Sequence, residues 1–358
     1  MADFLARPYK EIVIAALVPS LLYYVALFIQ ADLEACRRGI ARVEEELIPR
    51  LLSVLKSGWY FVLPFAALIY TLFWMNWQVQ KAAIAACVIT LIIGMLFGYK
   101  GQRMSLKDIY EAFRDTGLSI LDIMMIVAGA SFIIGVLQVT GLGFAFTLLL
   151  VQVGGGSVFL LLLLAGVMCI ILGMGMPTLA VYVLLAVLIA PSLVEVGITP
   201  IGAHMFILYL GMMSFLTPPV AIAAFFAASI AKADPMATGW VAVRFGWTAY
   251  VVPFLFVFAP SLLLQSQDVF VITVTIITSI AGVWMISAAM IGYMIRPAAI
   301  VVRVLAFITG ALLLVPIEIA DWAWWTDVVG AIFAVILVGG DFVMLRRRRA
   351  AEVSHVQR

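Results

Sequence analysis

The sequence predicts an all-α, polytopic integral membrane protein that contains a re-entrant helical hairpin followed by a discontinuous transmembrane helix. Of its 358 residues, 66% are apolar and only 11% are charged, and the mean hydropathy is +1.20. Because soluble domains carry roughly a quarter charged residues, a surface that faces water throughout is excluded. Several apolar runs approach the ~20 residues that a helix needs to cross a bilayer. Between residues 141 and 233, Gly and Pro interrupt shorter apolar segments, which predicts the hairpin and the broken helix.

The charge balance and the cysteines exclude further classes of protein. The net charge is +2, and no basic stretch is interleaved with aromatic residues, so no nucleic-acid partner is expected. Cys36, Cys87 and Cys169 form no CxxC pair, which indicates neither a disulfide framework nor a zinc site. The apolar run 12–30 is longer than a signal-peptide core and lacks a small-residue cleavage site, so we expect a retained span.

Apolar windows of about 19 residues divide the chain into spans and connecting parts. Spans are predicted near residues 12–30, 58–76, 81–99, 117–140, 239–265, 270–292, 299–317 and 328–345. The parts are a first span plus an amphipathic arm helix (1–57), scaffold spans (58–140), the core with the hairpin and broken helix (141–233), a closing span (234–265), appended C-terminal spans (266–345) and a basic cytoplasmic tail (346–358).

The segment 31–57 is not a span, because it carries five basic and five acidic residues. Its apolar residues recur at steps of three and four, which predicts one amphipathic helix that lies on the membrane or against a partner. A solvated connecting helix is the alternative, and Pro49 is expected to kink or end the helix. The apolar residues in question are Leu33, Cys36, Ile40, Val43, Leu47 and Leu51.

The basic residues predict the orientation of the chain. If the cluster 346–349 is cytoplasmic, and if 141–199 adds no net crossing, 18 of the 21 basic residues fall in cytoplasmic loops and the tail. Only Arg7, Lys10 and Lys81 fall outside. This asymmetry is what the positive-inside rule requires, so the C-terminus is predicted to be cytoplasmic.

The hairpin is predicted from two short apolar arms around a Gly- and Pro-rich tip. The first arm, 157–172, has 16 residues. As a helix it would be about 24 Å long, which is short of the ~30 Å hydrocarbon core. A second arm follows over 179–194. The tip between them, which we expect to stop at membrane depth, consists of Gly173, Met174, Gly175, Met176, Pro177 and Thr178.

The broken helix is predicted from an apolar segment 201–216, the sequence Thr217-Pro218-Pro219 and a second half-helix over 220–231. Proline has no N–H, so Pro177 is expected to leave the carbonyl of Gly173 unpaired. For the same reason, Pro218 and Pro219 should free the carbonyls of Ser214 and Phe215. Bare carbonyls persist at membrane depth only where protein, water or a cation satisfies them.

Together the two breaks predict an ion site that suits a hard cation such as Na⁺. Kinks packed among helices are the alternative, since Gly and Pro are common in membrane helices. Two breaks in consecutive segments, each with Pro and Thr, favour the site. The predicted sodium ligands are Gly173, Gly175, Thr178, Ser214, Phe215 and Thr217.

Three further polar residues are candidates for lining a substrate path. Asp122 lies a turn or two inside its predicted span. A functional role and structural anchoring are the two alternatives for it. His204 lies near the outer end of the first half-helix, and a hydrogen-bonded packing histidine is the alternative. Gln138 lines a path or satisfies backbone near the hairpin base.

Enzymatic interpretations lack their required groups. The chain has only two histidines, and it contains no HExxH, GxSxG or GxxxxGK[ST] motif. We therefore expect no enzyme activity and no cofactor, with Na⁺ as the coupling ion and no other metal. Without an ATP site, uphill movement of a solute would need an ion gradient.

The stretch from Leu172 to Gly246 resembles the second half of the large membrane subunit of tripartite ATP-independent periplasmic (TRAP) transporters. GMGMPT, LTPPVA and ADPMATGW occur in it in that order. The similarity is closest to the fused permease type that works with TAXI-class binding proteins. It covers about residues 4–265, and the last three spans look like an extension seen in some fused members.

The resemblance implies a sodium-driven, elevator-type transporter half in the inner membrane. It implies import of small organic acids such as C4-dicarboxylates, delivered by an extracytoplasmic binding protein. By resemblance, residues 173–178 are the second hairpin tip, and 214–219 are the helix break beside a sodium site. A complete member has a first inverted repeat and a small membrane subunit, so a missing N-terminal half or small subunit is an expected partner. The alternative is a truncated, non-transporting remnant or scaffold subunit.

Overall fold

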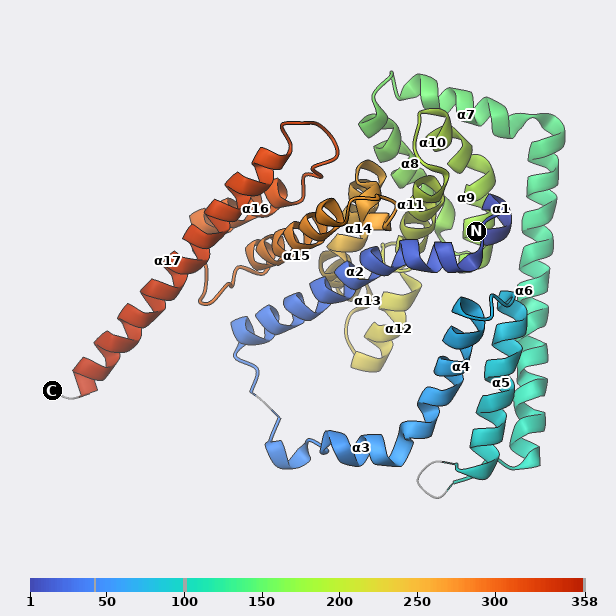
Figure 1. Cartoon of the computed structure of the whole chain (residues 1–358), viewed down its shortest axis with the longest axis horizontal. Helices are drawn as coiled ribbons and strands as arrows, with labels where there is room; N and C mark the ends of the chain where they lie inside the picture. The colour runs from blue at the N-terminus through green and yellow to red at the C-terminus, as the bar shows by residue number, and fades with distance from the viewer. Residues whose placement is uncertain (42, 99–101, 357–358) are drawn as a thin grey trace. The chain divides into compact units, whose positions relative to one another are not determined.

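The computed structural model describes residues 1–356 except 42 and 99–101 (Figure 1). Within these ranges every regular element is a helix, which confirms the all-α class. Six of the described helical segments are long and apolar enough to cross a membrane. Several shorter apolar helices accompany them, and these include both arms of the predicted hairpin.

The chain forms two compact units, and the first comprises residues 1–13 and 41–131. In this unit α4 packs against α5, and Tyr60 stacks on Phe97 with 5.3 Å between ring centroids. The Tyr60 hydroxyl also donates to the Gly98 carbonyl at 2.7 Å, which ties the start of α4 to the end of α5. The elements are α1 (Ala2–Leu5), η1 (Glu45–Leu47), α3 (Leu51–Gly58), η2 (Trp59–Phe61), α4 (Val62–Phe73), α5 (Val79–Leu96) and most of α6 (Leu106–Thr140).

The first long helix corrects one prediction. α2 runs over Tyr9–Arg38, and Gly39 ends it with a φ of 63°, which glycine adopts without steric cost. The Ile40 N–H then returns to the Ala35 carbonyl at 3.0 Å, and helix resumes only with η1 and α3. The prediction of a single amphipathic helix over 31–57 is therefore wrong.

The second unit comprises residues 14–40 and 132–358. Its centre is α11, which contacts α8, α9 and α14 (Figure 1). Leu162, Leu185 and Phe206 are fully buried there. The elements after α6 are α7 (Leu142–Val153), α8 (Val158–Gly173), α9 (Thr178–Leu188), α10 (Ala190–Glu195), α11 (Pro200–Met213), α12 (Ile222–Ala231), α13 (Pro235–Phe245), α14 (Trp247–Phe258), η3 (Pro260–Leu263), α15 (Val269–Ile291), α16 (Ile300–Leu313) and α17 (Trp324–Val356).

The last three helices pack through small residues. A Cβ added to Gly310 would lie 2.7 Å from the Gly282 carbonyl oxygen, and one added to Gly282 would lie 2.9 Å from the Gly310 carbonyl oxygen. Glycine at both positions thus lets the backbones of α15 and α16 approach closely, as is common between membrane helices. α17 packs against α16.

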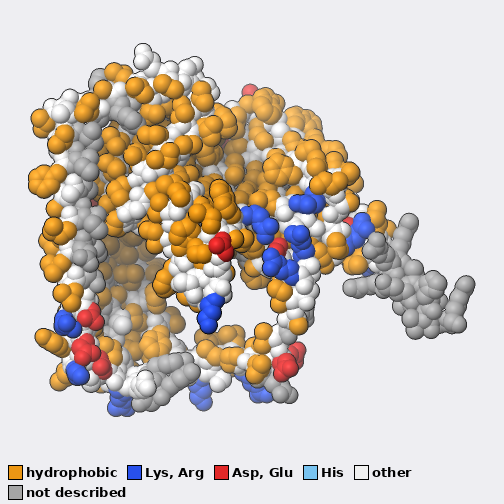
Figure 2. Space-filling model, turned by 180° about the vertical axis from the view of Figure 1, so that it is seen from behind, with side chains coloured by type: hydrophobic (Ala, Val, Ile, Leu, Met, Phe, Trp, Pro, Cys, Tyr) orange, Lys and Arg blue, Asp and Glu red, His pale blue; other side chains and the backbone are white. Residues whose placement is uncertain are grey.

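Apolar side chains also cover much of the outer surface, and Figure 2 shows them on most of the face in view. In the candidate span Leu51–Phe73 of the first unit, 0% of the apolar window is buried. Contiguous apolar surface of this kind requires lipid or a protein partner. This exposure supports the predicted bilayer environment.

Candidate functional site

The hairpin reverses over residues 174–177. Gly175 there has a φ of 78°, so the chain turns in a conformation that favours glycine. Pro177 then precedes α9 as its N-cap residue, where its missing N–H removes no helical hydrogen bond. α8 has 16 residues and α9 has 11. They are therefore about 24 and 16 Å long, each shorter than the ~30 Å hydrocarbon core.

The interruption of the second element lies between α11, which ends at Met213, and α12, which begins at Ile222. The Met213 carbonyl accepts both the N–H of Thr217 at 2.9 Å and its Oγ1 hydroxyl at 2.6 Å. The chain then passes through a cis Pro218–Pro219 peptide bond to Ala221, which has a φ of 32°. The predicted break is therefore a turn that the Thr217 side chain closes.

Ser214 joins the break to the hairpin. Its Oγ lies 2.9 Å from the Gly173 carbonyl oxygen and 2.8 Å from that of Gly211, and Ser214 is only 2% exposed. The hydroxyl has one proton, so it donates to one of these carbonyls at a time. A Cβ at Gly173 would lie 2.5 Å from the Gly211 carbonyl oxygen. The end of α8 thus approaches α11 as closely as glycine allows.

This contact corrects the expectation of free carbonyls. The Gly173 carbonyl accepts the Ser214 hydroxyl, and the Phe215 carbonyl accepts the Ala223 N–H at 3.1 Å, so the prediction is wrong for both. For Ser214, no hydrogen bond from any residue in the described ranges reaches the carbonyl oxygen. The protein therefore satisfies two of these carbonyls itself and leaves the third available.

The remaining tip residues are exposed or half-buried. Gly175, Pro177 and Thr178 are exposed, while Met174 and Met176 are half-buried. Among the described contacts, none joins Thr178 to Thr217, so the structure brings together Gly173 and Ser214 but not these two hydroxyls. The exposed part of the tip therefore includes Thr178.

Sequence reasoning missed Tyr250 on α14. Its hydroxyl lies 2.8 Å from Thr217 Oγ1, which places a second polar atom at the break. The available signal was a phenolic hydroxyl inside an apolar span, because a buried tyrosine usually finds a hydrogen-bond partner. Its partner was not predictable, since 33 residues separate the two side chains in sequence.

His204 lies away from the break. It is 8% exposed, and its Nδ1 is 2.7 Å from the hydroxyl of Tyr182 on α9. Ser214, which follows the last residue of α11, is ten positions further along the chain, about 15 Å along the helix axis. His204 therefore links the second hairpin arm to α11. The side chains of Asp122 and Gln138 lie outside the described residues.

α13 supports the break through the residues of two sequence motifs. A Cβ at Gly239 would lie 2.9 Å from Pro218 Cγ, so this glycine lets α13 pack against the proline. Asp234 caps α13 by accepting the Ala237 N–H at 2.7 Å, and Pro235 occupies the first turn. The LTPPVA and ADPMATGW motifs are therefore in contact in the fold.

A separate polar cavity of about 810 Å³ lies within the first unit. Arg7, Lys10 and Lys81 line it together with Asn76 and Trp77. Lys10 donates to Asn76 Oδ1 at 2.9 Å, which helps to fix its position. These are the three basic residues that the charge count places on the outer side, and they share one cavity.

Apolar spans, a hairpin with short arms and an interrupted helix bound to its tip together define a polytopic membrane permease. The family model for the tripartite ATP-independent periplasmic transporter, DctM component, matches residues 1–269. Because the match covers most of the chain, this protein belongs to the DctM family, the permease component of TRAP transporters. A comparison with curated proteins found no match.

The family match ends where α15 begins, at Val269. α16 and α17 also lie beyond it. The sequence resemblance, which ends near residue 265, has nearly the same limit. The last three helices are thus an addition to the part of the chain that the family model matches.

Proposed function

We propose that this chain is the permease subunit of a sodium-coupled TRAP transporter that imports small organic acids. The observation that carries the proposal is the contact between Ser214 and Gly173, which joins a hairpin tip to a helix break in a member of a transporter family. Half-helix ends with unwound backbone are where secondary transporters coordinate ions and substrate.

Sodium is the coupling ion that these oxygens suit best. Na⁺ is a hard cation and takes oxygen ligands, and the Ser214 carbonyl, the Thr217 hydroxyl and the tip oxygens are of that kind. A hydroxyl that donates its proton still has lone pairs for a cation. Ser214 Oγ and Thr217 Oγ1 therefore hold the backbone in place and are also available as ligands.

The cavity of the first unit supports carboxylates as the substrate class and an acidic docking surface on a binding protein. Arg7, Lys10 and Lys81 line this opening together with one carboxylate, Asp3, and Arg7 is paired with Glu11 at 3.3 Å. The remaining positive charge attracts anions and steers an oppositely charged partner. In the topology proposed here the C-terminus is cytoplasmic, the chain lies in the inner membrane and this cavity opens outward. The binding protein, of the TAXI type by resemblance, would deliver substrate from that side.

Reconstitution tests the proposal. The chain would be purified alone and together with the products of neighbouring reading frames, among them any further membrane subunit and a binding protein. Uptake of radiolabelled small carboxylates into proteoliposomes is expected only with the complementary chains and an inward Na⁺ gradient. No uptake in any combination would favour the remnant or scaffold subunit instead.

Thr178→Val and Thr217→Val are expected to weaken sodium binding on the order of tenfold each, because each removes one oxygen ligand and keeps the side-chain shape. The Thr217 variant also loses the hydrogen bond to the Met213 carbonyl that closes the turn. The measurement is the Na⁺ concentration that gives half of the sodium-dependent rise in unfolding temperature, with K⁺ as the comparison salt. Tyr250→Phe is the matched control, since it removes the neighbouring hydroxyl and leaves Thr217 Oγ1 in place. Unchanged Na⁺ dependence in both threonine variants would contradict the assigned site.

A further inference from the structure

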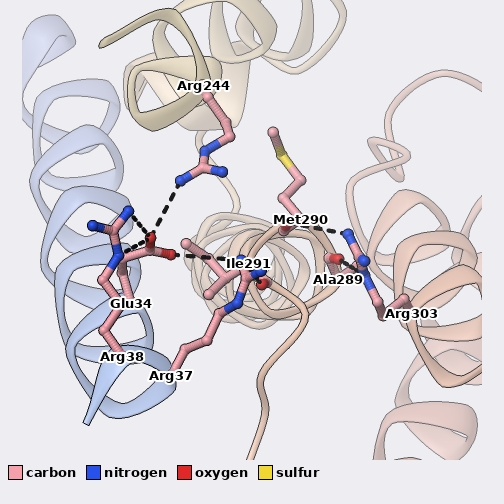
Figure 3. Close-up of polar contacts among 8 residues, drawn as sticks. All are labelled: Glu34, Arg37, Arg38, Arg244, Ala289, Met290, Ile291 and Arg303. Atoms are coloured by element: carbon pink, nitrogen blue, oxygen red, sulfur yellow. Dashed lines mark hydrogen bonds and ion pairs between the residues drawn. The ribbon is translucent and has the colours of Figure 1, made fainter. Parts of the chain in front are cut away.

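Three arginines gather around one carboxylate, and a fourth, Arg303, binds the end of α15 nearby in the second unit (Figure 3). Glu34 on α2 is that carboxylate, and its Oε1 accepts Arg38 Nε at 2.7 Å. Arg244 Nη2 from α13 lies 3.6 Å from the same oxygen, and Arg37 Nη1 lies 3.9 Å from Oε2. The Glu34 carboxylate therefore forms ion pairs with three guanidinium groups.

The end of α15 holds two of the arginines in place. Arg37 Nη1 donates to the Ile291 carbonyl at 2.7 Å, and Arg303 Nε donates to the Ala289 carbonyl at 2.8 Å (Figure 3). Gly292 follows with a φ of 77°, which closes the helix. A helix C-terminus carries about half a negative charge, so cations bound to its last carbonyls are favourable there.

The positive charge of this cluster exceeds what these contacts neutralise. Arg37, Arg38 and Arg244 share one carboxylate, Arg37 and Arg303 bind one helix end, and each guanidinium has five N–H donors. The nearby Arg296 is paired with Asp341 and contributes no net charge. Arg244 Nε is buried, and among the described residues it has no hydrogen-bond partner. Among the described residues the cluster thus has excess positive charge, one buried donor without an acceptor, and one buried acceptor, Glu34 Oε2, without a hydrogen-bond donor.

The cluster also lies where membrane spans end. Arg37 and Arg38 are in the last turn of α2, and the Ile291 carbonyl ends α15, both of which are candidate spans. Side chains at span ends reach the depth of lipid head groups. The side chains of Arg37 and Arg38 are 49% and 65% exposed, so they are open to a ligand.

We propose that Arg38 and Arg244, with Arg37, bind a phosphate group, and that its source is the phosphodiester of an anionic phospholipid. Guanidinium groups match phosphate oxygens in geometry and charge, and basic pockets between membrane helices take such head groups. A bound phosphate would neutralise part of the excess charge of these guanidinium groups. It would also connect α2 to α13, which carries the glycine that contacts Pro218.

Native mass spectrometry of the full chain in detergent tests the site, with phosphatidylglycerol, phosphatidylcholine and inorganic phosphate as separate probes. Phosphatidylglycerol is expected to bind more tightly than phosphatidylcholine and to raise the unfolding temperature. Arg38→Gln and Arg244→Gln should each weaken phosphatidylglycerol binding about five-fold. Lys232→Gln is the matched control, because this exposed cation at the end of α12 lies in the same unit.

Arg38→Gln decides the case if the Arg244 variant does not fold, because the Arg38 side chain is largely exposed. Arg38→Lys is expected to recover part of the affinity, which a role in folding alone does not predict. The proposal would be overturned if the two lipids bind equally tightly, or if Lys232→Gln and Arg38→Gln lose the same affinity for phosphatidylglycerol. If inorganic phosphate binds as tightly as phosphatidylglycerol, the proposal that the bound phosphate group belongs to a lipid is overturned.

Discussion

Gly173→Ala is expected to destabilise the protein by about 1–3 kcal/mol and to abolish transport. The new Cβ would lie 2.5 Å from the Gly211 carbonyl oxygen and 3.0 Å from Ser214 Oγ. A backbone carbonyl within a helix cannot rotate away as a side chain can, so α8 has to move from α11. The measurements are the unfolding temperature in detergent and uptake in proteoliposomes.

Gly340→Ala is the matched control, because a Cβ added there meets nothing within 4 Å. Alanine also favours a helix more than glycine does, so this variant should be neutral or slightly stabilising. Adding Ser214→Ala to Gly173→Ala should not restore stability, since the Gly211 carbonyl remains in place. Equal unfolding temperatures for the Gly173 and Gly340 variants would show that α8 and α11 are not in close contact.

Local chemistry made the hairpin and the break predictable. The arms were predicted over 157–172 and 179–194, and the structure has helices over Val158–Gly173, Thr178–Leu188 and Ala190–Glu195. Gly175 and Pro177 determine these limits through their own backbone preferences, which do not depend on distant residues. The prediction over 31–57 failed for a related reason. Hydrophobic periodicity continues past Gly39, but the left-handed conformation of that residue ends the helix.

Contacts between elements were not predictable in the same way. The Ser214–Gly173, Thr217–Tyr250 and Tyr182–His204 hydrogen bonds join residues 41, 33 and 22 positions apart. Which carbonyl is paired depends on how close α8 comes to α11, and packing along both helices determines that distance. A proline identifies a carbonyl that loses its helical donor. It does not identify the side chain that replaces this donor.

Ser214→Ala is expected to cost about 1–3 kcal/mol, because it removes the hydroxyl donor at 2.9 Å from the buried Gly173 carbonyl and leaves it only the Met176 N–H at 3.5 Å. Ser229→Ala is a close control. Both serines donate to the carbonyl three residues earlier, to Gly211 and Phe226 respectively, but only Ser214 also reaches another helix. Hydrogen exchange at the tip, residues 174–178, should accelerate in the Ser214 variant and stay unchanged in the Ser229 variant.

The same variant separates two roles of the Ser214 hydroxyl. If it only holds the tip, Ser214→Ala should speed exchange at residues 174–178 and leave the Na⁺ concentration for half-stabilisation unchanged. If its lone pairs also bind the ion, that concentration should rise as well, and Ser214→Thr should restore it because the oxygen returns. We expect the second result, since the proton of this hydroxyl goes to a carbonyl and its lone pairs remain available. The Ser214→Ala variant could instead show the same hydrogen exchange at residues 174–178 and the same half-stabilising Na⁺ concentration as Ser229→Ala. That result would contradict both roles of the Ser214 hydroxyl, and with them the link between hairpin and break.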